Sequence, residues 1–191
     1  MWKVFWYKLR NLPYLLRSLR VPIGAYVGRL GGAVTAYGKL QMSLIDVDGT
    51  RYDYGTVGYK VVTTSGVNYL ALAFSAQYGC KAEDFNYHAS GTGTLGEYAS
   101  NTVLGTEVTD SARPAGTRIA LASTGGGTGS AYRTIGTIAY TSSHSITEHG
   151  LFNQVTVAGS TMWDRTVFTA VSVTNGQSLQ FAYQLAINSG G

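Results

Sequence analysis

Short runs of alternating apolar and polar residues, separated by turn-forming residues, fill most of this chain. The clearest run covers residues 178–187, in which large apolar side chains alternate with Gln and Ala. Successive side chains of a strand point to opposite faces of its sheet, so this alternation predicts a strand with one buried face. A chain built from such runs is constrained to fold mainly as antiparallel β-sheet.

Five further runs of β-branched and aromatic residues lie between Gly, Asn and Ser. They cover residues 85–89, 117–122, 131–141, 145–152 and 162–173. Several short strands with turns between them predict an antiparallel β-sandwich or jelly-roll-like domain.

Two dipeptides predict hairpins within this domain. The Asp-Gly pair at 48–49 lies between alternating segments 40–44 and 52–57, the pattern of a hairpin with a tight turn. The Asn-Gly pair at 175–176 lies between the last two runs and predicts that they pair with each other. Residues 67–77 are the one helical segment expected in the domain.

The first forty residues differ from the rest in charge and in periodicity. They hold seven basic residues and no acid, whereas the remainder holds seven basic and ten acidic residues. Apolar residues recur at spacings of three and four, which places them on one stripe of a helix: Trp2, Phe5, Leu9, Leu12, Leu16, Leu19 and Ile23. Pro13 should divide this segment into two short helices.

This N-terminal segment has the composition of a docking arm. Basic residues interrupt it too often for a secretory signal or a transmembrane helix. A protein partner is favoured over a membrane surface, an organelle transit peptide or nucleic acid, and folding back onto its own domain is a further alternative. The residues expected to bind the partner are Trp2, Lys3, Phe5, Trp6, Tyr7, Lys8, Leu9, Arg10, Leu12, Tyr14, Leu16, Arg17, Leu19 and Arg20.

Residues 24–38 are rich in Gly and small residues and predict a linker. We therefore expect an arm and linker over residues 1–38 and a β-rich domain over residues 39–191. Cys80 is the only cysteine, which excludes an intrachain disulfide.

The motifs that could carry chemistry are weak. Glycines at 91, 93 and 96 match G-x-G-x-x-G, but no helical stripe follows, so a loop is expected. In a strand, Glu148 and His149 would point to opposite faces, which argues against a metal triad with His144.

His88 is expected to be a lone histidine in a strand. Asp164 and Arg165 are expected to form a surface ion pair, and the alternative is that one of them points inward and needs a partner. We expect no enzyme: no catalytic, cofactor-binding or metal-binding residue is predicted.

Four segments resemble proteins of tailed bacteriophage particles: YHASGTGT (87–94), NTVLGTEV (101–108), ITEHGLFN (146–153) and the tail from WDRTVF to the end (163–191). The resemblance covers about residues 39–191 and is to virion-associated proteins, some of which look like capsid decoration (cement) proteins.

The resemblance implies a virion structural protein without catalytic residues. The expected partners are the major capsid protein and neighbouring copies of this chain in the capsid shell, after assembly in the host bacterial cytoplasm, with no specific nucleic acid. A tail or head-fibre adaptor is the alternative, and a carbohydrate-binding β-sandwich module is a second one.

Overall fold

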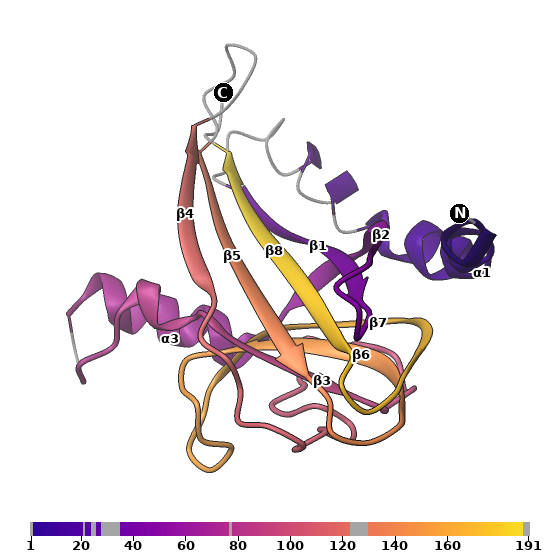
Figure 1. Ribbon diagram of the computed structural model, residues 1–191. Coiled ribbons are helices and arrows are strands. Elements are labelled where there is room, and N and C mark those ends of the chain that lie inside the picture. The colour runs from indigo at the N-terminus through magenta and orange to yellow at the C-terminus, as the bar shows by residue number, and fades with distance from the viewer. Residues whose placement is uncertain are drawn as a thin grey trace.

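The structure is a computed structural model that describes residues 2–20, 22–23, 26–27, 35–76, 78–122 and 130–188. In this part of the chain, eight antiparallel strands form one curled sheet, a half-barrel, with two α-helices beside it (Figure 1). The elements in chain order are α1 (Trp2–Ser18), β1 (Thr35–Ile45), β2 (Arg51–Val62), α3 (Thr64–Phe74), the 3-10 helix η1 (Ala82–Asp84), β3 (Tyr87–Gly91), β4 (Thr117–Ala122), β5 (Ser130–Ala139), β6 (His144–Phe152), β7 (Met162–Val173) and β8 (Ser178–Asn188).

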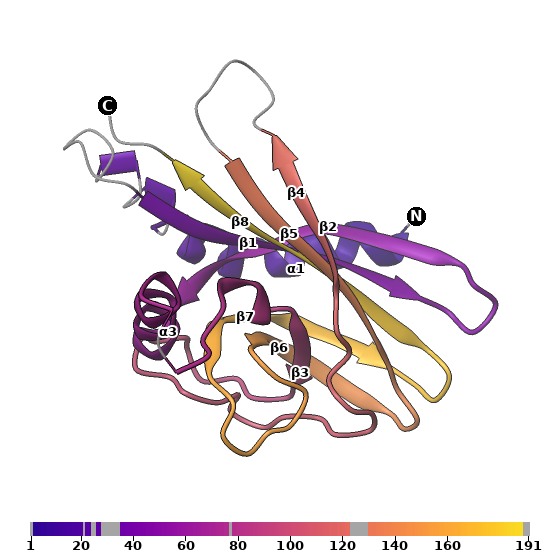
Figure 2. The ribbon, with the colours of Figure 1, turned by 90° about the vertical axis from the view of Figure 1, so that its left-hand side faces the viewer.

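The strands follow the order β3-β6-β7-β2-β1-β8-β5-β4. β2 pairs with β1 along most of its length, but only Val61 and Val62 pair with β7, so the ladder is short at that junction. There the sheet curls, and β1, β2, β8, β5 and β4 come to lie above β7, β6 and β3 (Figure 2). The His88 ring of β3 lies directly against Gly136 of β5.

The mainly β class is therefore confirmed, and the N-terminal helix is present. A sandwich or jelly roll is not confirmed, because one continuous strand order connects both halves of the curl. The apolar core lies inside this curl, with fully buried side chains from both halves, such as Leu40, Ile146 and Phe181.

The first predicted hairpin is confirmed, and the second is wrong. β1 and β2 join through residues 46–50, where Gly49 has a φ of +82°. β7 pairs with β2 and β6, whereas β8 pairs with β1 and β5. The Asn-Gly turn does form, with Gly176 at a φ of +84°, but its backbone bonds to Tyr140 on the chain segment after β5. The tight turn thus connects β7 in one half of the curl to β8 in the other half.

Both helices depart from the expected bounds. The Thr63 hydroxyl accepts a bond from the Gly66 amide and caps α3, which ends at Phe74; Gln77 lies outside the described residues. α1 continues through Pro13 as one helix, so the expected division into two is wrong. Pro13 and Leu9, whose carbonyl loses its helical partner there, are both exposed residues.

The predicted linker at 24–38 falls mostly outside the described residues. Its last four residues, 35–38, belong to β1. The division into an arm and a domain at residue 38 stays a prediction.

A chain of buried polar side chains crosses the interior of the curl. Lys60 Nζ lies 2.6 Å from Asp164 Oδ1 and 2.8 Å from His149 Nδ1. His149 Nε2 lies 3.0 Å from His88 Nδ1, and His88 Nε2 lies 3.2 Å from Thr134 Oγ1. All five side chains are inaccessible to solvent, and they come from β2, β7, β6, β3 and β5.

The chemistry of lysine sets the direction of these hydrogen bonds. A charged lysine only donates, so Lys60 donates to His149 Nδ1. His149 then carries its proton on Nε2 and donates to His88, whose Nε2 proton goes to Thr134. Burial, reinforced by the Lys60 charge, lowers the pKa of His88 to about 3 and holds the pKa of His149 well below its ordinary value. Both rings are therefore neutral at pH 7.

These lowered pKa values predict that stability falls with acid. Below about pH 6.5 the unfolded histidines bind protons that the folded ones do not, so the free energy of unfolding decreases as the pH falls towards the folded pKa. Between pH 7 and 5.5 the unchanged protein should lose about 1 kcal/mol more than a His88→Gln variant. Urea unfolding at both pH values measures this difference.

The control is His144→Gln, which removes a histidine outside the buried chain. Its free energy of unfolding at the two pH values shows separately what the contact between His144 and Asp110, at 2.9 Å, contributes to the acid sensitivity. Equal slopes for the unchanged protein and His88→Gln would contradict the assignment of a neutral, buried His88.

Candidate interaction surface

Polar contacts hold α1 against the body. Asn11 is 3% exposed, and its Nδ2 donates to the Val57 carbonyl of β2 at 2.9 Å, while its Oδ1 accepts from the Thr169 amide of β7 at 3.0 Å. The Ser18 hydroxyl accepts from the Tyr59 amide at 3.1 Å. These side chains satisfy backbone groups of β2 and β7 that would otherwise be unpaired under the helix.

One aromatic contact supplements the polar ones. The ring of Tyr7 stacks on Tyr54 with centroids 4.2 Å apart, and burial raises the pKa of Tyr7 well above its ordinary value. Lys3 lies over the Tyr52 ring, 4.9 Å from its centroid. Tyr7 was expected to contact a partner, but here its side chain packs against its own domain.

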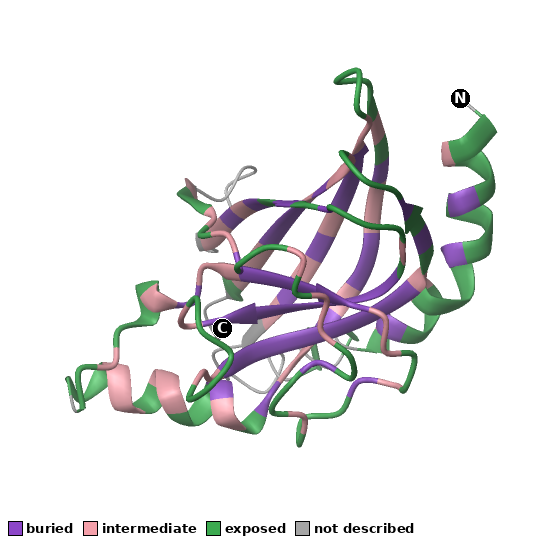
Figure 3. Ribbon diagram, turned by 60° about the horizontal axis from the view of Figure 1, so that its bottom comes forward, coloured by how far each residue is buried: buried purple, intermediate pink, exposed green. Residues whose placement is uncertain are grey.

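The apolar side of α1 faces solvent. At about 100° per residue, it lies roughly opposite the buried side formed by Tyr7, Asn11 and Ser18. Figure 3 shows α1 exposed over most of its surface. We call this exposed set the α1 stripe: Trp2, Phe5, Trp6, Leu9, Leu12 and Leu16, from 45% exposed at Leu12 to 74% at Trp2.

Aromatic contacts and positive charge define the α1 stripe further. Phe5 makes edge-to-face contacts with Trp2 and Trp6, so three aromatic rings form one cluster. The basic residues expected at the surface lie along or beside the stripe and have no acidic neighbour on the helix: Lys3, Lys8, Arg10, Arg17 and Arg20. The two remaining arm residues, Tyr14 and Leu19, lie nearer the body; Tyr14 is 37% exposed and Leu19 is half-buried.

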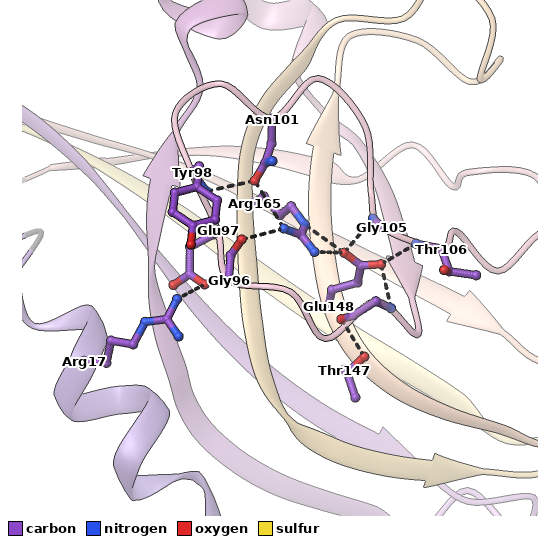
Figure 4. A network of polar contacts seen from close by, with 11 residues as sticks. Arg17, Gly96, Glu97, Tyr98, Asn101, Gly105, Thr106, Thr147, Glu148 and Arg165 are labelled. Carbon is purple, nitrogen blue, oxygen red and sulfur yellow. Dashed lines mark hydrogen bonds and ion pairs between the residues drawn. The ribbon is translucent and has the colours of Figure 1, made fainter.

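A buried carboxylate organises the loop that follows β3 (Figure 4). Glu148 Oε1 accepts from the amides of Gly93 at 2.8 Å and Thr106 at 2.9 Å. Its Oε2 accepts from the Gly105 amide at 3.0 Å and from Arg165 Nε at 2.7 Å. Burial alone would raise the pKa of Glu148, but the Thr106 and Gly105 amides and Arg165 hold it below the ordinary value.

The same loop reaches α1. Arg165 Nη1 donates to the Gly96 carbonyl and to Asn101 Oδ1, both at 3.2 Å. Glu97, 4% exposed, then binds Arg17 of α1 at 3.3 Å (Figure 4). Two sets of polar contacts, joined by the peptide bond between Gly96 and Glu97, therefore connect the inside of the sheet to the C-terminal half of α1.

The glycine motif serves this loop. A Cβ atom on Gly91 would lie 2.5 Å from Glu148 Oε1, and one on Gly93 would lie 2.4 Å from the same atom. Only glycine lets the backbone approach the carboxylate this closely. No helix follows in the described chain, so the expected loop is confirmed.

The structure separates the remaining polar candidates. His144 binds Asp110 at 2.9 Å, whereas Glu148 and His149 enter two different buried networks. The expected surface ion pair of Asp164 and Arg165 is wrong, because both are buried and each has its own partner, Lys60 and Glu148 respectively.

His88 is not a lone histidine, since it bonds to His149. Among the described residues, no three His, Cys, Asp or Glu side chains gather as metal ligands would, and no helix is long and apolar enough to cross a membrane.

The sequence reasoning missed Asn11 and Ser18. Their signal was present, because Tyr7, Asn11 and Ser18 are four and seven residues apart and so share one helical face. What the sequence could not show is that the body offers unpaired backbone groups of β2 to that face.

Replacing Asn11 with Ala should release α1. The change leaves the Val57 carbonyl and the Thr169 amide without partners, which costs about 1–3 kcal/mol per buried group and favours undocking of the helix. Hydrogen exchange of residues 2–18 should accelerate while the strands stay protected. Leu12→Ala on the exposed side is the control, and unchanged exchange in Asn11→Ala would contradict this role.

Comparison with known proteins adds no relative. No family model matches the chain, and no curated protein or solved structure is similar enough to count as a match. The geometry of α1 and its surroundings therefore carries the functional argument.

Proposed function

We propose that this protein is a non-enzymatic structural protein of a bacteriophage particle, a capsid decoration protein that binds the shell through the α1 stripe. One observation carries the proposal: α1 is held by its polar side, so its aromatic and aliphatic side faces outward. An isolated protein gains nothing from this orientation, since burying the stripe would be favourable. A binding partner that covers the α1 stripe would account for this orientation.

The residues of the stripe suit a protein partner. Trp is enriched among residues that dominate binding energy, and each large apolar side chain that becomes buried contributes about 1.5–3 kcal/mol. Arg17 is paired with Glu97, and Lys3 lies over the Tyr52 ring. The cations that would meet acidic groups around an apolar groove on the partner are therefore Lys8, Arg10 and Arg20. Because α1 is already folded and docked, binding costs little conformational entropy.

The proposed position of this protein in the capsid shell rests on the sequence resemblance. Its partners there would be the major capsid protein and neighbouring copies of this chain. We also propose that the body is a sandwich or jelly-roll-like domain. The contact between His88 of β3 and Gly136 of β5, which face each other across the curl, supports this description. The same α1 surface would serve a tail or head-fibre adaptor. Copy number separates the two stations, because shell proteins occupy many equivalent lattice positions and tail proteins few.

Two substitutions in the stripe test the proposal. Phe5→Ser with Leu9→Ser removes two exposed apolar side chains without touching the polar side of α1. Binding to purified shells that lack this protein should weaken by about 100-fold, or roughly 2.7 kcal/mol. Co-sedimentation with the shells measures the affinity.

The matched control is Val47→Ser with Val67→Ser, which removes two similarly exposed apolar side chains outside α1. It should bind as the unchanged protein does. Unaltered shell binding by the α1 variant would refute the docking model. Binding of the unchanged protein to anionic vesicles but not to shells would instead assign the stripe to a membrane surface.

A further inference from the structure

An apolar pocket of about 310 Å³ lies beside α3. Leu70 and Phe74 of α3 line one side, and Leu185 of β8 and Tyr132 of β5 line another, with Trp163 of β7 also in its wall. α3 and α1 lie on opposite sides of the molecule in Figure 1, so this pocket is separate from the α1 stripe.

The polar atoms of the aromatic lining are already bonded within the protein. Trp163 Nε1 donates to the Tyr183 hydroxyl at 2.6 Å. The Tyr132 hydroxyl donates to the Phe85 carbonyl at 2.9 Å. Because these donors are satisfied, the lining rings offer mainly carbon surface to an occupant, which needs no hydrogen-bonding group of its own.

The wall of the pocket is held in place from behind. Trp163 and Tyr183 are almost fully buried, and Lys60 lies 5.4 Å from the centre of the Tyr183 ring. Gly66 of α3 packs against the Trp163 backbone, where a Cβ atom would lie 2.7 Å from its carbonyl oxygen. A pocket formed before binding spares the ligand the cost of ordering its walls.

Charge at the rim selects against a carboxylate. Glu83 lines the pocket. The Arg118 guanidinium forms an ion pair with the Glu83 carboxylate at 3.6 Å and donates a hydrogen bond to the Glu83 carbonyl at 3.1 Å. Among the described lining residues, the one charged side chain is therefore the acid Glu83, and its partner Arg118 is already paired. A fatty acid would bring a carboxylate to this rim without a described lining cation to pair with it, whereas an uncharged molecule of the same length needs no such partner.

We propose that this pocket binds a small, uncharged, largely hydrocarbon ligand. Its volume lies at the lower end of the roughly 300–1,000 Å³ typical of ligand pockets, which suits a single alkyl chain or a compound of two or three rings and not a docked helix. This binding is independent of the α1 stripe and of the proposed role in a virus particle.

A titration of the full chain with N-phenyl-1-naphthylamine, an uncharged apolar dye, tests the proposal. Saturable binding of one dye per chain is expected. 1-Dodecanol should displace the dye, and dodecanoate should do so at least about tenfold less well. Equal displacement by both would overturn the assignment of an uncharged ligand.

Substitutions on α3 locate the dye. Leu70→Trp fills the pocket and should weaken binding by about tenfold or more, whereas Asn68→Trp on the opposite side of α3 should leave it unchanged. The Phe5→Ser, Leu9→Ser variant should also bind dye normally, which separates this site from α1. Dye binding that is lost in the α1 variant but kept in Leu70→Trp would overturn the proposal.

A spectroscopic readout needs no variant. In the unchanged protein the indole N–H resonance of Trp163 should shift on addition of dodecanol, while those of Trp2 and Trp6 should stay in place. No saturable binding and no Trp163 shift would refute the pocket as a ligand site. If the unchanged protein binds no dye but Leu70→Trp changes its self-association, the pocket is a contact between copies of the chain and the proposal is overturned.

Discussion

The ion pair between Lys60 and Asp164 lies at the junction on which the curl of the sheet depends. The ladder between β2 and β7 has only two residue pairs, and the ion pair adds a side-chain link within the same segment. Removing two charges from water is costly, and their attraction offsets the cost only with further hydrogen bonds. His149 supplies one of these, and His88 and Thr134 extend the link to β5 on the facing half.

Two consecutive residues of β7 serve the two sides of the sheet. Asp164 points into the curl towards Lys60, whereas Arg165 binds Glu148 and, through the loop after β3, connects to Glu97 and α1. The alternation of side chains along a strand places these two networks back to back. The position of α1 is thereby coupled to the segment that shapes the core.

Alternation and helical spacing predict local structure well but not the partners of each element. Residues 178–187 form β8 almost as expected, and the Asp-Gly hairpin is where the pattern places it. The prediction that β7 pairs with β8 was wrong because a turn restricts only the local path of the chain. The contact of the turn with Tyr140, and the strands of the other half of the curl, determine where β8 pairs. The buried chain of polar side chains escaped prediction because Lys60 and His149 are 89 residues apart, and only the folded sheet brings them together.

The attachment of α1 also has a consequence for the time course of synthesis. The Thr169 amide that Asn11 binds lies 158 residues later in the chain. At about 5–20 residues per second, a ribosome adds β7 roughly 8–30 s after the helix has been made. Throughout that interval the nascent helix lacks its site on β7, and its aromatic side is open to chaperones.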